Sequence, residues 1–240
     1  MGRLIMVEGL DLSGKSTLVA GLAAELGRQG VPVSVRRNVL VAGNGVAAEA
    51  DRMRRDPGRD RLRTAQLFLA AHLYDAAHFS LDPSLVHVQD SWWLRTLAWE
   101  RWNGHEQAAQ ALEAAALTFP RFDAVLVLTA SPAERQRRYH LRGKNDAGDA
   151  LVFTAPADFA RLDGILCAEA RRRGAAVLDT TGLTPAQVLL RASTLLLPDL
   201  YSPRSVPQTD STMASVSAAG VPLERRNASS SSRPSWSFTQ

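Results

Sequence analysis

A glycine-rich string near the N-terminus has the residue types and the spacing of a phosphate-binding loop. Gly9-Leu10-Asp11-Leu12-Ser13-Gly14-Lys15-Ser16-Thr17 contains the pattern G-x-x-x-x-G-K-S/T. Glycines let successive backbone N–H groups turn toward an anion, and a helix that follows adds the positive end of its dipole. In such a loop the lysine reaches the β and γ phosphates, and the next hydroxyl holds Mg²⁺. These residues, called the phosphate loop below, therefore predict a site for ATP, with Lys15 as its cation and Ser16 as a metal ligand.

A second chemical group is expected at Asp90, which ends the apolar run 85–89. A metal bound to a triphosphate needs a nearby acid, and in an open parallel sheet that acid lies at the C-terminal end of a neighbouring strand. Asp90 is therefore predicted to bind Mg²⁺ together with Ser16. Its alternative role is to cap the helix that follows, and the two roles are compatible.

Alternating strands and helices must position these groups. The apolar run 3–8 stops at Gly9, and leucines then recur every fourth residue until Gly30, which predicts a strand, a loop and a helix. The later segments repeat this alternation, so we expect an α/β fold with a parallel sheet of about five strands and helices on both faces. Strands are predicted at 31–36, 84–89, 122–129 and 175–178, and helices at 44–55, 61–79, 92–118, 131 onward, 156–173 and 185 onward.

Composition limits the number of domains and the kind of partner. With 240 residues, 45% of them hydrophobic, the chain can form one substantial core. We expect one domain over residues 1–200 and a disordered Ser/Pro-rich tail over 201–240, where too little apolar surface is present to offset the entropy of ordering. The single cysteine, Cys167, excludes an internal disulfide. No run is long enough to span a bilayer, so we expect a cytoplasmic protein without a membrane partner.

Clusters of arginine occur at 52–63, 135–142 and 171–173, although the net charge is only +4. They could bind nucleic acid, but they alternate with alanine, leucine and acids as the solvated face of a helix does. We therefore predict no nucleic-acid partner.

Several motifs together resemble the thymidylate kinases, which belong to the nucleoside monophosphate kinase group of P-loop NTPases. The segment Glu8–Thr17 resembles the opening E-G-x-D-x-x-G-K-S/T-T, and Asp90–Trp99 is similar to the family's D-R-Y/H/W and S-x-x-A-Y/F stretch. Further similarity lies at Leu67-Phe68, in Phe119–Asp123, and at Ser131-Pro132, Arg138 and Arg142-Gly143. The resemblance implies a three-layer sandwich and covers roughly residues 3 to 195.

The resemblance also implies an activity, which is Mg²⁺-dependent transfer of the ATP γ-phosphoryl group to a nucleoside monophosphate similar to dTMP. A mobile lid over about 142–155 would carry arginines toward the transferred group. Arg138 and Arg142 lie four residues apart before the polar segment 143–148, and are the candidate catalytic cations with Lys15. Alternatively, they form a solvated arginine face with Arg135 and Arg137.

For the acceptor, the resemblance implies that Asp11 contacts the sugar hydroxyl, Phe68 stacks on the base and Arg37 contacts the acceptor phosphate. Trp99 is a second aromatic candidate, although Phe68 and Trp99 could equally be core residues. Three departures fall in this half of the site. Ser91 replaces an arginine, for which Arg95 is a possible substitute; the stretch R-E-P-G-G-T is replaced by residues 37–42; and His72 replaces a base-reading arginine.

These departures leave the acceptor open. One alternative is a kinase of an unphosphorylated nucleoside or another small acceptor, and a second is a degenerate protein that binds nucleotide without catalysis. The resemblance allows a homodimer.

Overall fold

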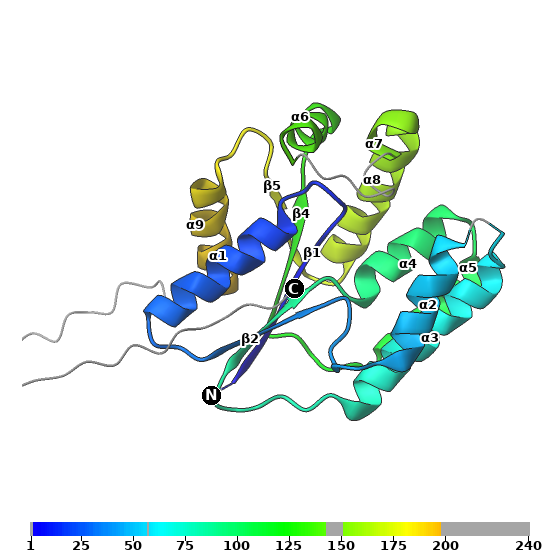
Figure 1. The fold of residues 1–240 in the computed structure, drawn as a ribbon, viewed down its shortest axis with the longest axis horizontal. Coiled ribbons are helices and arrows are strands. Elements are labelled where there is room, and N and C mark those ends of the chain that lie inside the picture. Colours follow the sequence, from blue (N-terminus) through cyan, green and yellow to red (C-terminus); the bar gives the residue numbers. More distant parts are fainter. Residues whose placement is uncertain (1, 57, 143–150, 198–240) are drawn as a thin grey trace, which may run out of the picture. The chain divides into compact units, whose positions relative to one another are not determined.

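A parallel sheet of five strands forms the centre of the protein. The computed structural model describes residues 2–56, 58–142 and 151–197. The strand order is β2-β3-β1-β4-β5, and every neighbouring pair is parallel (Figure 1). This confirms the predicted α/β fold with about five strands. The strands are β1 (Arg3–Gly9), β2 (Val33–Arg37), β3 (Val86–Asp90), β4 (Ala124–Thr129) and β5 (Ala176–Asp179).

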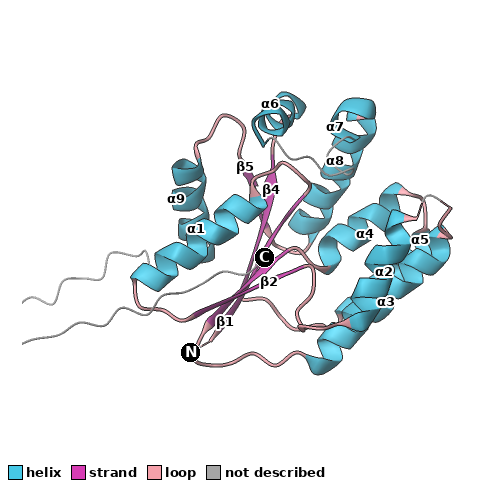
Figure 2. Cartoon of the chain, in the orientation of Figure 1, coloured by secondary structure: helices cyan, strands magenta, loops and turns pink. Residues whose placement is uncertain are grey.

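Helices cover both faces of the sheet (Figure 2). α1 and α9 pack together on one face, while α4 and α8 pack together on the other. α2 and α3 also pack against each other, beside α5 (Figure 1). The helices are α1 (Lys15–Arg28), α2 (Gly45–Arg55), α3 (Arg61–His78), α4 (Trp93–Trp102), α5 (Glu106–Ala116), α6 (Pro132–Arg142), α7 (Leu151–Thr154), α8 (Pro156–Arg172) and α9 (Pro185–Leu196).

Successive side chains of β1 belong to two different hydrophobic clusters, one on each face of the sheet. Ile5 and Val7 pack in the cluster that contains Leu22 of α1, whereas Met6 between them belongs to the cluster that contains Leu166 of α8. Successive side chains of a strand point to opposite faces, and both faces of a covered parallel sheet are dry, which explains why the middle of β1, from Leu4 to Val7, is apolar at every position. The central strand is consequently held from both sides, which gives the loop that follows it a rigid base.

The predicted helical stretch 92–118 is wrong as a single element, because α4 and α5 are separate helices. The chain turns between them at Gly104, where φ is 76°, a left-handed conformation that glycine adopts without steric cost. The predicted mobile loop and the Ser/Pro-rich tail lie mostly outside the described residues, so those two predictions remain untested; residues 151–154 of the predicted lid form α7. Within residues 2–56, 58–142 and 151–197, none of the helices combines the length and the apolar composition of a membrane span.

Candidate active site

The phosphate loop connects the C-terminal end of β1 to the first residue of α1. Three of its residues have positive φ angles, which are 144° at Gly9, 63° at Leu12 and 98° at Gly14. A Cβ atom on Gly9 would lie 2.4 Å from the carbonyl oxygen of Leu128, so only glycine fits where the loop leaves the sheet. No side chain caps the N-terminus of α1, and its first turn has no acidic residue. This helix end is therefore suited to an anionic ligand.

Lys15 is the first residue of α1, and its side chain folds back over the loop. The Nζ atom donates a hydrogen bond to the carbonyl oxygen of Leu10 at 3.1 Å, and the residue is only 7% exposed. Burial, followed by repulsion from Arg95, lowers the pKa of Lys15 to about 8, while attraction from nearby carboxylates opposes this shift. An anion beside Nζ would oppose this shift and stabilise the charged form of the lysine.

Ser16 and Asp90 are brought together as the metal prediction requires. The Ser16 hydroxyl donates to Oδ2 of Asp90 at 3.1 Å, and Arg37 Nε lies 3.8 Å from the same carboxylate oxygen. The register explains this proximity, because Asp90 pairs with Val7 of β1 and with Arg37 of β2. The three strands thus end at one edge of the sheet, where ligands of open α/β folds bind.

The donor set of this pair fits Mg²⁺. A hydroxyl and a carboxylate are hard oxygen ligands, and Mg²⁺ often uses one or two protein oxygens together with waters and phosphate oxygens. Across residues 2–56, 58–142 and 151–197, no group of three or more His, Cys, Asp and Glu residues could hold a metal. A metal bound mainly by phosphates does not require such a group.

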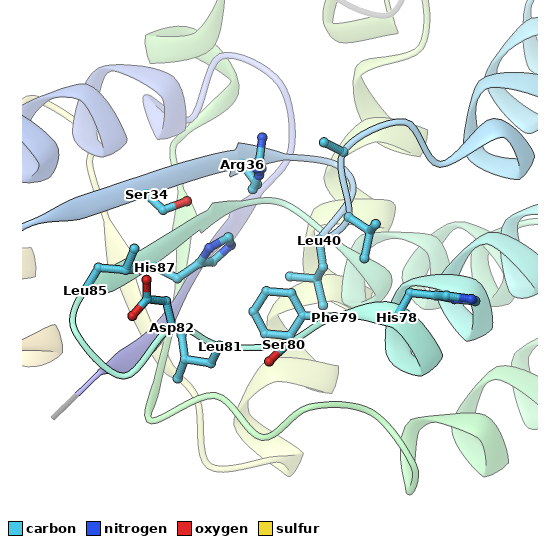
Figure 3. Close-up of a pocket in the computed structure, with 12 residues that line it drawn as sticks. Ser34, Arg36, Leu40, His78, Phe79, Ser80, Leu81, Asp82, Leu85 and His87 are labelled. Carbon is cyan, nitrogen blue, oxygen red and sulfur yellow. The ribbon is translucent and has the colours of Figure 1, made fainter.

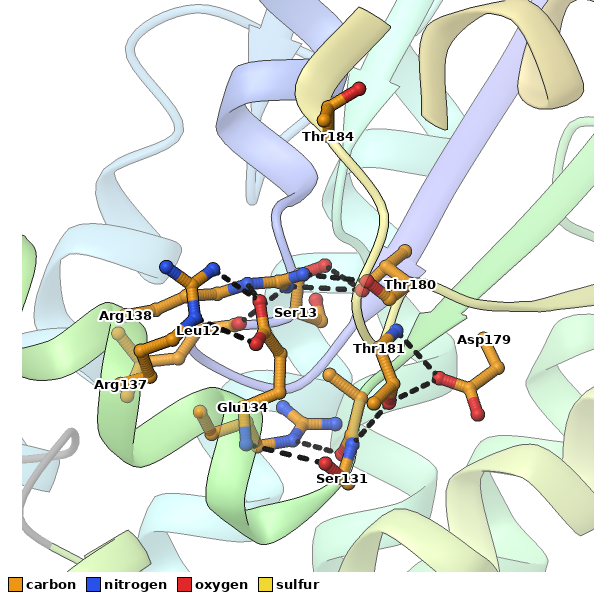
Figure 4. A network of polar contacts seen from close by, with 12 residues as sticks. Leu12, Ser13, Ser131, Glu134, Arg137, Arg138, Asp179, Thr180, Thr181 and Thr184 are labelled. Carbon is orange, nitrogen blue, oxygen red and sulfur yellow. Dashed lines mark hydrogen bonds and ion pairs between the residues drawn. The ribbon is translucent and has the colours of Figure 1, made fainter. Parts of the chain in front are cut away.

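The side chain of Arg138 contacts the backbone of the phosphate loop. Its Nη1 donates to the carbonyl oxygen of Leu12 and to the Thr180 hydroxyl, both at 3.0 Å, and its Nη2 donates to the Thr180 carbonyl at 2.8 Å (Figure 4). Its Nε pairs with Glu134 at 2.8 Å. The Thr180 hydroxyl also bonds the carbonyl oxygen of Ser13. In this arrangement Arg138 connects α6 and the segment after β5 to the phosphate loop, and its predicted catalytic role is not tested.

The other arginines of α6 differ in their surroundings. Arg135 is 1% exposed and donates to the carbonyl oxygen of Asp11 at 2.5 Å and to Asp163 at 2.7 Å. Arg142 ends α6, and its positive charge helps to lower the pKa of Asp11. The solvated face that the sequence offered as an alternative therefore holds for Arg137, which is exposed, but not for Arg135.

Asp11 lies among positive charges. Burial alone would raise the pKa of this carboxyl, but attraction from Lys15 and Arg95, and then from Arg135 and Arg142, lowers it overall. Asp11 is therefore held as a carboxylate, the form that accepts a hydrogen bond from a hydroxyl group.

The predicted acceptor residues of α3 and α4 are partly or fully buried. His72 packs against Trp92 and lies 3.0 Å from the Thr96 hydroxyl through Nε2, whereas no hydrogen-bond partner for Nδ1 is found among the described residues. Burial, with repulsion from Arg95, lowers the pKa of His72 to about 3, so the ring is neutral. Phe68 and Trp99 are half-buried. None of these observations tests their predicted contacts with a ligand.

Asp75, which the sequence did not single out, connects the segments that carry the predicted acceptor residues. Its buried carboxylate accepts four hydrogen bonds, which come from the Leu40 N–H at 2.9 Å, the Val41 N–H at 3.1 Å, Asn44 Nδ2 at 2.9 Å and Trp92 Nε1 at 2.9 Å. It thereby joins the segment after β2 to α3 and to the start of α4. The available signal was an acid three residues after His72 in an otherwise apolar part of a helix.

Glu8, the first residue of the E-G-x-D motif, is a second buried acid. It is 0% exposed, and its Oε1 accepts a hydrogen bond from the Trp92 N–H at 2.6 Å. Burial raises the pKa of Glu8, against attraction from Arg95 and Lys15. Glu8 therefore connects β1 to the chain that follows Asp90.

A surface pocket of about 220 Å³ lies beside the segment after β2, and Leu40 and Val41 are among its lining residues. Its wall includes Ser34 and Arg36 of β2, His87 of β3 and Phe79 after α3 (Figure 3). None of its lining residues belongs to the phosphate loop or to the predicted acceptor set. The candidate site is therefore defined by the converging polar groups at the sheet edge.

Comparison with solved structures identifies the fold. A thymidylate kinase from Candida albicans matches with a TM-score of 0.64 and 15% identity, over 83% of this chain and 92% of that one. A thymidylate kinase from Ehrlichia chaffeensis matches with a TM-score of 0.58 and 17% identity, over 81% of this chain and 98% of that one. No family model and no curated protein matches the sequence. The chain therefore has a P-loop fold similar to that of thymidylate kinases, with little sequence in common.

Proposed function

We propose that this protein transfers the γ-phosphoryl group of ATP to a nucleoside monophosphate. The observation that carries the proposal is the arrangement of Lys15, Ser16 and Asp90 at the end of the phosphate loop. The Ser16–Asp90 pair, with its 3.1 Å separation, supplies the oxygen ligands expected for Mg²⁺, and Lys15 supplies a buried positive charge beside the phosphates.

Phosphoryl transfer requires positioning and positive charge more than covalent chemistry from the protein. The N–H groups of the phosphate loop and the Lys15 ammonium would bind the β and γ phosphates, and Ser16 and Asp90 would hold the metal. When bound, Mg²⁺ offsets the negative charge of the phosphates. A phosphate oxygen of the acceptor forms the new bond to the γ-phosphorus as the bond to ADP breaks. That oxygen is already an anion, so the step needs no general base.

The proposal is tested by acceptor-dependent release of ADP. The purified protein with Mg²⁺ and ATP is assayed against dTMP, dUMP, dCMP, dAMP and dGMP, and against the corresponding nucleosides. We expect turnover with at least one monophosphate and its loss in Lys15→Ala. Arg28→Ala, at the exposed end of the same helix, should retain the activity. If no acceptor increases ADP release above the background, the protein is not a kinase of these substrates.

A further inference from the structure

Arg95 lies between the phosphate loop and the end of β2. It is the third residue of α4, and its Nη2 donates a hydrogen bond to the side-chain oxygen of Asn38 at 3.0 Å. Its positive charge acts on Lys15 and Asp11 in the loop and on Glu8 beneath it. The guanidinium group is therefore close enough to the phosphate loop for its charge to act on the residues of the loop.

In the described part of the chain, the Arg95 guanidinium group has no direct counter-charge. Among the described residues its hydrogen bond is to a neutral amide, and no carboxylate lies within ion-pair distance. An arginine has five N–H donors in a planar fork that matches phosphate geometry, and this hydrogen bond occupies one of them. A partly buried arginine that is held by an amide, beside a repelling lysine, is arranged to receive an anion.

Asn38 is held in the conformation that permits this contact. Its φ angle is 62°, a left-handed conformation that asparagine tolerates better than most other residues with a side chain. Its backbone N–H donates to the carbonyl oxygen of Asp90 at 2.9 Å. Asn38 therefore bonds Arg95 through its side chain and Asp90, the proposed metal ligand, through its backbone. These two hydrogen bonds position the arginine relative to the metal site.

We propose that Asn38 is a positioning residue that directs Arg95 onto the phosphate of a nucleoside monophosphate acceptor. This proposal rests on the proposed kinase function and names the acceptor group that the site selects. Arg37 lies 3.8 Å from Asp90 on the same edge and provides a second cation nearby. In the reaction, a phosphate oxygen of the acceptor forms a bond to the γ-phosphorus, the bond from that phosphorus to the bridging oxygen breaks, and ADP leaves with the electron pair.

The experiment compares variants that separate charge from positioning. Arg95→Ala removes the cation, and Arg95→Lys keeps a charge but loses the fork. Asn38→Gly removes the amide at a φ angle that glycine accepts, whereas Asn38→Asp adds a carboxylate that neutralises Arg95 and repels the acceptor. The matched control is Arg36→Ala, which removes an exposed arginine of β2, two residues before Asn38. Thermal unfolding of each variant verifies that it folds.

KM is measured for ATP and for the monophosphate that the wild type phosphorylates best among the five tested. Arg95→Ala should raise the KM of the monophosphate about 10- to 100-fold, and Asn38→Gly about 3- to 10-fold, with the KM of ATP nearly unchanged. Arg95→Lys should recover part of the loss, and Asn38→Asp should be worse than Asn38→Gly. In calorimetry, the affinity for the matching unphosphorylated nucleoside should not change in any of these variants.

A double substitution tests the positioning role itself. If Asn38 acts through Arg95, Asn38→Gly should add nothing measurable to Arg95→Ala. Additive effects, an equal rise in the KM of ATP, or an unchanged KM of the monophosphate in Arg95→Ala would overturn the proposal while leaving the kinase function intact. Turnover with nucleosides alone would also overturn it. Absence of any acceptor-dependent turnover in the wild type would remove the kinase function, and this proposal with it.

Discussion

The pH dependence of ATP binding should report directly on Lys15. Burial lowers the pKa of this lysine from 10.5 to about 8, and repulsion from Arg95 adds to the effect. At about 1.4 kcal/mol per pH unit, the difference corresponds to roughly 3 kcal/mol in favour of the neutral amine. Between about pH 8 and 10.5 the unfolded chain therefore binds more protons at this group than the folded chain, so its contribution to stability rises with pH in this range.

ATP should reverse this preference, because its phosphates favour the ammonium form. Below about pH 8 the lysine is already charged, so the affinity should change little with pH. Above that value each binding event must take up a proton, and the association constant should fall by about tenfold per pH unit.

Calorimetric titration with Mg²⁺-ATP, from about pH 7 to about pH 9.5 in buffers of different ionisation enthalpy, measures both quantities. The wild type and the Arg28→Ala control should take up close to one proton per ATP at the upper end. Lys15→Met should take up none, bind ATP more weakly at neutral pH and be at least as stable as the wild type there. Equal affinities at both ends of the pH range in the wild type, or proton uptake that persists in Lys15→Met, would refute the reasoning.

Three further perturbations test the contacts around the site. Asp75→Ala leaves four hydrogen-bond donors without their acceptor and should lower the free energy of unfolding in urea by roughly 3–5 kcal/mol; exposed Asp82→Ala is its control. Arg138→Ala releases the Leu12 carbonyl and should weaken ATP binding by about tenfold in calorimetry, whereas Arg137→Ala should not. Asp90→Asn should abolish most of the Mg²⁺ dependence of ATP binding, measured by titration with and without the metal.

Different results would contradict each of these three expectations. A loss below about 1 kcal/mol in Asp75→Ala would mean that water replaces the carboxylate at little cost. Unchanged ATP affinity in Arg138→Ala, with a loss of turnover instead, would favour the direct catalytic role predicted from the sequence. An unchanged response to Mg²⁺ in Asp90→Asn would place the metal ligands elsewhere.

Local sequence patterns were sufficient to predict those parts of the site whose conformation depends on neighbouring residues in the chain. The conformation of the phosphate loop follows from glycines at fixed spacing, and the start of α1 follows directly from it. Asp90 could also be located, because a residue that ends a buried parallel strand must lie at the same sheet edge as the end of its neighbour. In both cases the backbone determines where the side chain lies, and the backbone is readable from periodicity and glycine placement.

The division of 92–118 shows the limit of such patterns. Both α4 and α5 have helical composition, and in the sequence only Gly104 marks the turn between them. A single glycine can also occur inside a long helix at modest cost, so its left-handed conformation was not evident from the sequence. Packing of α4 against α8 and of α5 against α3 decides the direction of each helix.

The sequence by itself therefore determined the parallel α/β architecture, the phosphate loop and the acid expected beside it. Only the tertiary structure decided what the longer side chains contact: Arg138 bonds a carbonyl 126 residues away, Arg95 bonds an amide 57 residues away, and Asp75 accepts hydrogen bonds from two distant segments, the one after β2 and the one before α4. The physical reason is that a backbone pattern depends on neighbours in the sequence. The partner of a buried charge depends instead on which distant segment the packed core brings within hydrogen-bond distance.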